Sequence, residues 1–136
     1  MSVWKTVKND VLGSNVNEKM LEAALADLGI GLDKATKSIR NSWGTDTCDA
    51  AIVNSQGRVT AMGIRWTNKR GIELVGDTFA GGFGHGIGDK GQETLMNKIA
   101  QAYQVRHIKH KMQLNNWTVE SQTTENGQVK LVLVQA

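Results

Sequence analysis

The chain has few of the residues that cross-link a protein or anchor it in a membrane. Its single cysteine, Cys48, cannot form an intramolecular disulfide, and the N-terminus lacks the pattern of a secretory signal. We therefore expect a reducing, cytoplasmic location. No apolar run approaches the roughly 20 residues that a membrane-spanning helix needs, so no membrane partner is expected. Proline is absent, so the turns must use Gly, Asn and Asp.

Length and composition are those of a globular protein. The 136 residues are 40% hydrophobic and 21% charged, which predicts a single domain over residues 1–136. The 16 basic residues exceed the 13 acidic ones only slightly. The densest basic cluster lies between Arg106 and Lys111, with no aromatic residues interleaved for base stacking, so nucleic acid is not an expected partner.

The first half of the chain predicts a strand, a helix and three further strands. The helix has the clearest pattern, because Asn17 can cap its start, apolar residues recur at helical spacing, and Gly29 can end it. Turns are predicted at residues 44–46 and 55–57. The expected strands are 3–11, 36–43, 49–54 and 58–67, and the expected helix is 17–28.

The second half predicts the same order of elements. A strand at 71–79 is followed by a helix at 92–104 and by strands at 106–114, 117–124 and 128–135, the last two joined by the turn signal Asn126-Gly127. We predict an α+β fold in which two helices pack on one face of an antiparallel sheet. A duplicated βαβββ unit, with pseudo-repeats at 1–68 and 69–136, is a hypothesis from this pattern.

The most unusual segment is a glycine-rich loop between a predicted strand and a predicted helix. Glycines allow backbone N–H groups to converge on an anion, and a helix N-terminus adds positive charge. The loop has neither the ending of a phosphate-binding loop nor the spacing of a dinucleotide site, and a connection without a ligand is the alternative. The candidate ligand-binding residues are Gly82, Gly84, His85, Gly86, Gly88 and Lys90.

Other groups that could carry chemistry do not form a coherent set. His107 and His110 would point to opposite faces of the predicted strand, so no metal and no cofactor is expected. Cys48 has no histidine near it in sequence and is read as a core residue. Trp43 and Trp66 are read as core residues that could instead line a ligand groove.

Several short motifs in order resemble one protein family. They include Leu21 to Gly29, Met62 to Trp66, Glu73 to Asp77, Ile99 to Tyr103 and Gly127 to Leu131. Together they resemble a family of small proteins of unknown function that are encoded in algal plastids, cyanobacteria, bacteria and phages. The resemblance spans nearly the whole chain except the 81–91 loop. It implies a shared fold and a cytosolic or stromal location, and it transfers no activity.

These observations favour a non-enzymatic binding or accessory protein that captures a small anionic ligand such as a nucleotide. If a phage encodes it, sequestration of a nucleotide signal in the host cytosol is one version. The first alternative is an enzyme acting on a phosphorylated or carboxylated metabolite, with Glu73 or Asp77 as base. The second is a homo-oligomeric scaffold or virion-associated protein whose Trp-bearing strand edges pair with other chains.

Overall fold

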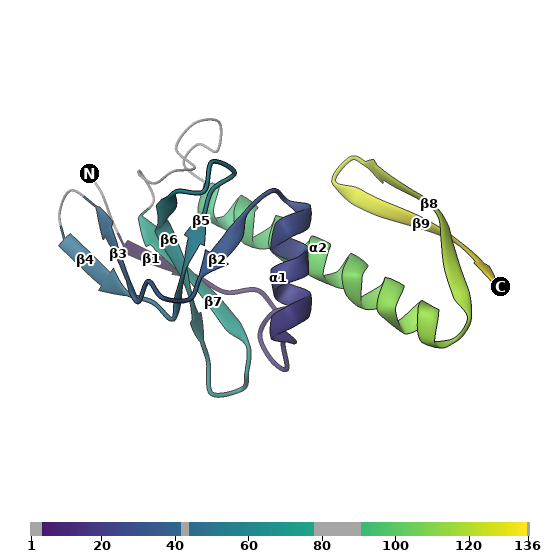
Figure 1. Ribbon diagram of the computed structural model, residues 1–136, viewed down its shortest axis with the longest axis horizontal. Helices are drawn as coiled ribbons and strands as arrows, with labels where there is room; N and C mark the ends of the chain where they lie inside the picture. The colour runs from purple at the N-terminus through teal and green to yellow at the C-terminus, as the bar shows by residue number, and fades with distance from the viewer. Residues whose placement is uncertain (1–3, 42–43, 78–90, 136) are drawn as a thin grey trace.

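The computed structural model describes residues 4–41, 44–77 and 91–135, with the side chains of Trp4, Lys5, Asn41 and Asp77 left out. The described residues form two helices and nine strands, which confirms the α+β class (Figure 1). The helices are α1 (Glu18–Asp27) and α2 (Gly91–Leu114). The strands are β1 (Trp4–Val7), β2 (Gly31–Asp33), β3 (Ser38–Asn41), β4 (Gly44–Thr47), β5 (Ala50–Val53), β6 (Val59–Trp66), β7 (Ile72–Asp77), β8 (Trp117–Glu125) and β9 (Gln128–Gln135).

The central element is a five-stranded antiparallel sheet with the order β1-β7-β6-β5-β2. The predicted hairpin of β5 and β6 is confirmed. In its turn the Asn54 side chain accepts hydrogen bonds from the backbone N–H groups of Gln56 and Arg58, and Gly57 has a φ of 79°. A polar loop of this kind satisfies much of its own backbone hydrogen bonding.

The two helices cover one face of the sheet and share its main core. The buried apolar residues of this core come from α1, from α2 and from β5, β6 and β7: they include Leu21, Leu25, Ile52, Ile64, Leu74, Met96 and Ile99. A small ribbon of β3 and β4 packs on the sheet through a second cluster, in which Ile39 of β3 and Cys48, just after β4, join Ala51 of β5 and Val75 of β7. The sheet therefore lies between a helical layer and a short β-ribbon (Figure 1).

Helix α1 begins and ends where the sequence predicts. The Asn17 side chain accepts a hydrogen bond from the backbone N–H of Met20, 3.0 Å away. Gly29 has a φ of 77°, a left-handed conformation that glycine adopts without strain. The backbone N–H of Asn17 also donates to the hydroxyl of Tyr103, so the start of α1 is tied to α2.

The strand predicted at 106–114 is wrong, because these residues continue α2 to Leu114. Val105, Ile108 and Met112 recur at helical spacing, and Val105 is buried. The segment also contains the good helix formers Arg106, Lys109, Lys111, Met112, Gln113 and Leu114, so the apparent alternation of residue types is compatible with a helix. The second half of the described chain therefore runs β7, α2, β8, β9 and does not show the element order of a second βαβββ unit.

Smaller differences concern short strands. Gly44–Thr47, where we predicted a turn, is strand β4, and β2 was not predicted at all. The first strand, predicted over 3–11, stops at Val7, and the loop that follows it contains the fully buried Leu12. Three- and four-residue strands carry too few side chains to show a period of two.

Strands β8 and β9 form a separate two-stranded sheet beside the C-terminal half of α2 (Figure 1). The predicted hairpin is confirmed, since Asn126 and Gly127 both have positive φ, 52° and 76°. The Gln101 side chain on α2 donates a hydrogen bond to the Gly127 carbonyl. No helix in the described residues is long and apolar enough to span a membrane.

Candidate functional site

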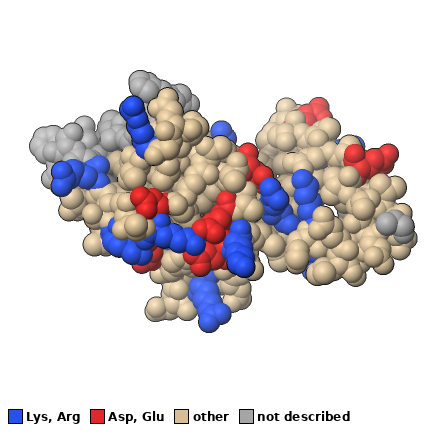
Figure 2. Space-filling view, in the orientation of Figure 1, with Lys and Arg blue, Asp and Glu red and all other residues tan. Residues whose placement is uncertain are grey.

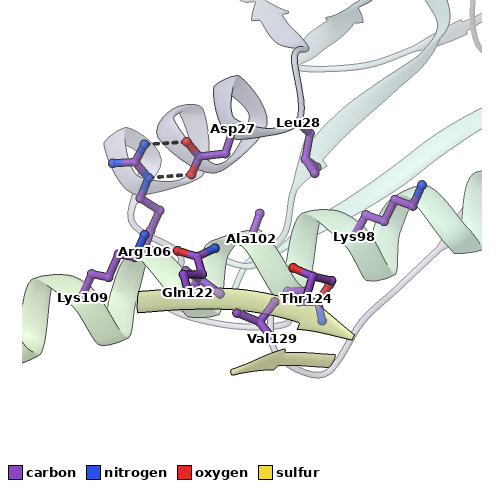
Figure 3. Close-up of a pocket in the computed structure, with 11 residues that line it drawn as sticks. Asp27, Leu28, Lys98, Ala102, Arg106, Lys109, Gln122, Thr124 and Val129 are labelled. Carbon is purple, nitrogen blue, oxygen red and sulfur yellow. Dashed lines mark hydrogen bonds and ion pairs between the residues drawn. The ribbon is translucent and has the colours of Figure 1, made fainter. Parts of the chain in front are cut away.

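A groove of about 610 Å³ lies where the end of α1, the middle of α2 and the β8–β9 hairpin meet (Figure 3). Helix α2 forms its floor, because its lining residues recur at helical spacing from Lys98 to Lys109. The hairpin contributes residues of the face that looks toward α2. The lining residues are Asp27, Leu28, Lys98, Gln101, Ala102, Val105, Arg106, Lys109, Gln122, Thr124 and Val129.

An ion pair holds one side of this groove. Arg106 on α2 binds the carboxylate of Asp27 on α1 with two hydrogen bonds, each 2.6 Å long (Figure 3). The hydrogen bond from Arg106 lowers the pKa of Asp27, burial opposes this, and the positive charges of Arg106 and Lys109 lower it further. Asp27 is therefore ionised at neutral pH, and Arg106 is fixed in a bidentate geometry.

The remaining charges of the groove are positive. Lys98 and Lys109 line it, and neither forms an ion pair within the part of the chain that the structure describes. Figure 2 shows basic side chains in the hollow between the hairpin and the rest of the molecule. With three basic residues and one acidic residue among its lining, the groove has a net positive charge that attracts anions.

The other lining groups provide both hydrogen bonds and apolar contact. Gln101, Gln122 and Thr124 supply amide and hydroxyl groups. Leu28, Ala102, Val105 and Val129 supply apolar surface. A cavity of this size that mixes apolar walls with a few polar groups matches the usual form of a small-molecule site.

Of the predicted site residues, only Trp66 belongs to the described residues. Its backbone N–H donates to the Asp49 carboxylate at 2.6 Å, and the residue lines a second cavity of about 260 Å³ beside Lys34 and Lys37. This cavity is separate from the groove, since the two share no lining residue. Trp43 and the loop residues Gly82, Gly84, His85, Gly86, Gly88 and Lys90 lie outside the described residues.

The other residues weighed from sequence have ordinary structural roles. Cys48 is buried, its thiol lies 3.6 Å from the Thr36 carbonyl, and burial raises the pKa of that thiol, which disfavours the reactive thiolate. Glu73 forms an ion pair with Lys8 at 3.7 Å, while the side chain of Asp77 is outside the described part. Because residue 107 is helical, the His107 ring stacks on Tyr103. The described residues contain no group of three or more His, Cys, Asp and Glu placed to hold a metal.

Sequence reasoning missed the groove because it placed Arg106 and Lys109 on a strand. The signal was nevertheless present. Lys98, Gln101, Ala102, Val105, Arg106 and Lys109 follow the spacing of one helix face, and a helix extended to Leu114 would have put them together. The partners Asp27 and Gln122 could not have been assigned, because only the tertiary packing brings them to this face.

Comparisons with known proteins give the family of the chain. Neither the curated proteins nor the solved structures include a match to it. One family matches residues 24–132, which covers α2, the groove and most of the β8–β9 hairpin. The matched range also contains most of the motifs on which the sequence resemblance rests, from Ala24 to Leu131. The chain belongs to this family, which is described as "Protein of unknown function (DUF1257)".

Proposed function

We propose that this protein is a non-enzymatic binding or accessory protein that captures a small anionic ligand, such as a nucleotide, in the groove between α1, α2 and the β8–β9 hairpin. The observation that carries the proposal is the charge of the lining. Lys98 and Lys109 face a cavity of about 610 Å³ in which Asp27, the only carboxylate among the described lining residues, is already bound by Arg106. An anion that enters would meet two basic groups that have no acidic partner in the described part of the chain.

The charged and the apolar lining residues of the groove would bind different parts of the ligand. The ammonium groups of Lys98 and Lys109 would hold a phosphate or carboxylate as point charges. The apolar surface of Leu28, Ala102 and Val105 would accept an uncharged ring, with Gln101 and Gln122 available for its edges. The low pKa of Asp27 leaves this carboxylate without a proton to donate, which favours capture over acid catalysis.

The glycine-rich loop remains a second proposed determinant of anion binding. Its residues from Gly82 to Lys90 directly precede α2, whose first described residue is Gly91. If the loop binds the ligand instead of the groove, then Lys90→Ala combined with His85→Ala would weaken binding while groove variants would not. The two sites are therefore separable by mutation.

The first test is native mass spectrometry of the purified protein, followed by denaturation and identification of any released small molecule. Titration calorimetry with ATP then compares the wild type with a Lys98→Gln, Lys109→Gln variant. We expect at least a tenfold loss of affinity for each lysine removed, which corresponds to about 1.4 kcal/mol. This loss should shrink as salt rises, because exposed charges are screened.

The matched control removes the same amount of charge elsewhere. Lys69 and Lys111 are exposed and do not line the groove, so Lys69→Gln with Lys111→Gln should bind as the wild type does. Equal losses in both double variants would mean that only the overall charge matters. That result would overturn the groove as the site.

A further inference from the structure

The β8–β9 hairpin is packed too lightly for a sheet of only two strands. None of its described residues is buried, and Val132 and Val134 on the face away from α2 are 38% and 44% exposed. Neither strand pairs with any other described strand. A two-stranded hairpin is only marginally stable in isolation, and it is usually stabilised by a third strand or by packing against another element.

The two edges of this hairpin differ in how well they resist pairing. Strand β8 has a register shift between Val119 and Ser121, and it carries Glu120 and Glu125. Bulges and charges are devices that block strand addition. Strand β9 runs regularly over eight residues with Lys130 as its single charge. The β9 edge is thus the one open to another strand.

A shallow groove lies along β9 and provides room for such a strand. It measures about 330 Å³ and has α2 residues on one side and β9 residues on the other. Ile108 on α2 is 41% exposed there, and Val129 and Leu131 of β9 face it. The full lining is Gln101, Gln104, Val105, Ile108, Gly127, Gln128, Val129 and Leu131. An added strand would cover the apolar part of this lining.

We propose that β9 pairs antiparallel with β9 of a second copy, around a twofold axis through Val132. A twofold interface must be self-complementary, and this strand meets that condition. With Val132 opposite itself, Leu131 of one copy faces Leu133 of the other, and Lys130 faces Val134. The register keeps the two Lys130 charges apart and places no acidic residue opposite another. The result is a four-stranded sheet with an α2 helix beneath each half.

The proposed dimer interface is small, and its area limits the affinity between the two copies. Eight residues of strand span about 27 Å, and a strip about 15 Å wide covers the edge and one packed side-chain layer. Each copy would then bury on the order of 400 Å², or roughly 800 Å² in total, which is below the roughly 1,200 Å² of stable interfaces and in the range of weak, transient contacts. We therefore expect a dimer that forms in the high micromolar range and dissociates on dilution.

Sedimentation equilibrium of the full chain between about 5 and 500 μM tests the dimer, and a cysteine cross-link tests its register. Val132→Cys should give a disulfide-linked dimer under mild oxidation, because directly opposite Cβ atoms are close enough for one. The native Cys48 is buried and contributes little background. Thr123→Cys on β8 is the control, since two further strands would separate the copies at that position.

A charge variant completes the test. Val132→Glu places two carboxylates opposite each other and should weaken the dimer at least tenfold, whereas Thr123→Glu, equally on the exposed face, should not. Circular dichroism verifies that both variants fold. A wild-type monomer at 500 μM, or equal cross-linking at 132 and 123, overturns the proposal. ATP binding by the monomeric Val132→Glu variant shows separately whether the anion site stands.

Discussion

The ion pair between Asp27 and Arg106 joins the end of α1 to the middle of α2. Both of its side chains are 40% or more exposed, so solvent screens the pair and its contribution to stability is small. Its two parallel hydrogen bonds nevertheless fix the guanidinium at the rim of the groove. The main effect of this ion pair is therefore to position the Arg106 side chain, and its contribution to the free energy of unfolding is small.

This pair makes the stability of the fold depend on pH in a predictable direction. The folded pKa of Asp27 lies below its ordinary value of 3.8, mainly through the hydrogen bond from Arg106. Its contribution is therefore present above about pH 4 and is lost as the pH falls through the folded pKa. We expect Asp27→Asn to lower the free energy of unfolding by less than about 1 kcal/mol at pH 7 and by less still at pH 2.5, because protonation removes the carboxylate charge.

Urea denaturation of the wild type and of Asp27→Asn at both pH values measures the difference. Asp10→Asn is a suitable control, because Asp10 is exposed and makes no side-chain hydrogen bond or ion pair among the described residues. A difference that grew as the pH fell would contradict the ion pair as its source.

At the scale of elements, α1 shows how a short helix is held at its start. The Asn17 side chain caps it, and the Asn17 backbone N–H donates to the Tyr103 hydroxyl of α2. Asn17→Ala removes only the side-chain cap, so we expect a loss of about 1 kcal/mol in the free energy of unfolding. Thermal or urea unfolding measures it. Asn17→Ser retains a capping oxygen and should lose much less, and equal losses would show that capping is not the cause.

The elements that could be predicted are those with local chemical signals at their ends. Asn17 and Gly29 delimit α1, and Asn126-Gly127 marks the β8–β9 turn. The second half of α2 lacked such a signal, and its apolar residues fit a strand as well as a helix, so only the structure shows that the helix continues to Leu114. The groove depends on that helix and on packing between distant segments. It could therefore not be predicted while Arg106–Leu114 was taken as a strand.

At the scale of the whole molecule, the β8–β9 hairpin contributes to the proposed binding surfaces but not to the core. The main buried cluster draws on α1, α2 and the five-stranded sheet, and no residue of β8 or β9 belongs to it. The hairpin instead supplies Gln122, Thr124 and Val129 to the groove and the β9 edge to the proposed dimer. Helix α2 therefore serves both the core and the groove, whereas the hairpin serves only the proposed binding surfaces.

A chain that ends at Asn116 tests this role of the hairpin. It should unfold in one cooperative transition with a free energy of unfolding about 1–2 kcal/mol lower, since it uncovers little more than Val105 and its apolar neighbours on α2. The same chain should lose ATP binding in the groove and remain monomeric at every concentration. Gln101→Ala in the full chain removes one hydrogen bond to the hairpin turn and provides an intermediate case. If the truncated chain does not unfold cooperatively, the core needs the hairpin in order to fold. The hairpin would then cover a face of α2 that the fold cannot leave exposed, in addition to any role in binding.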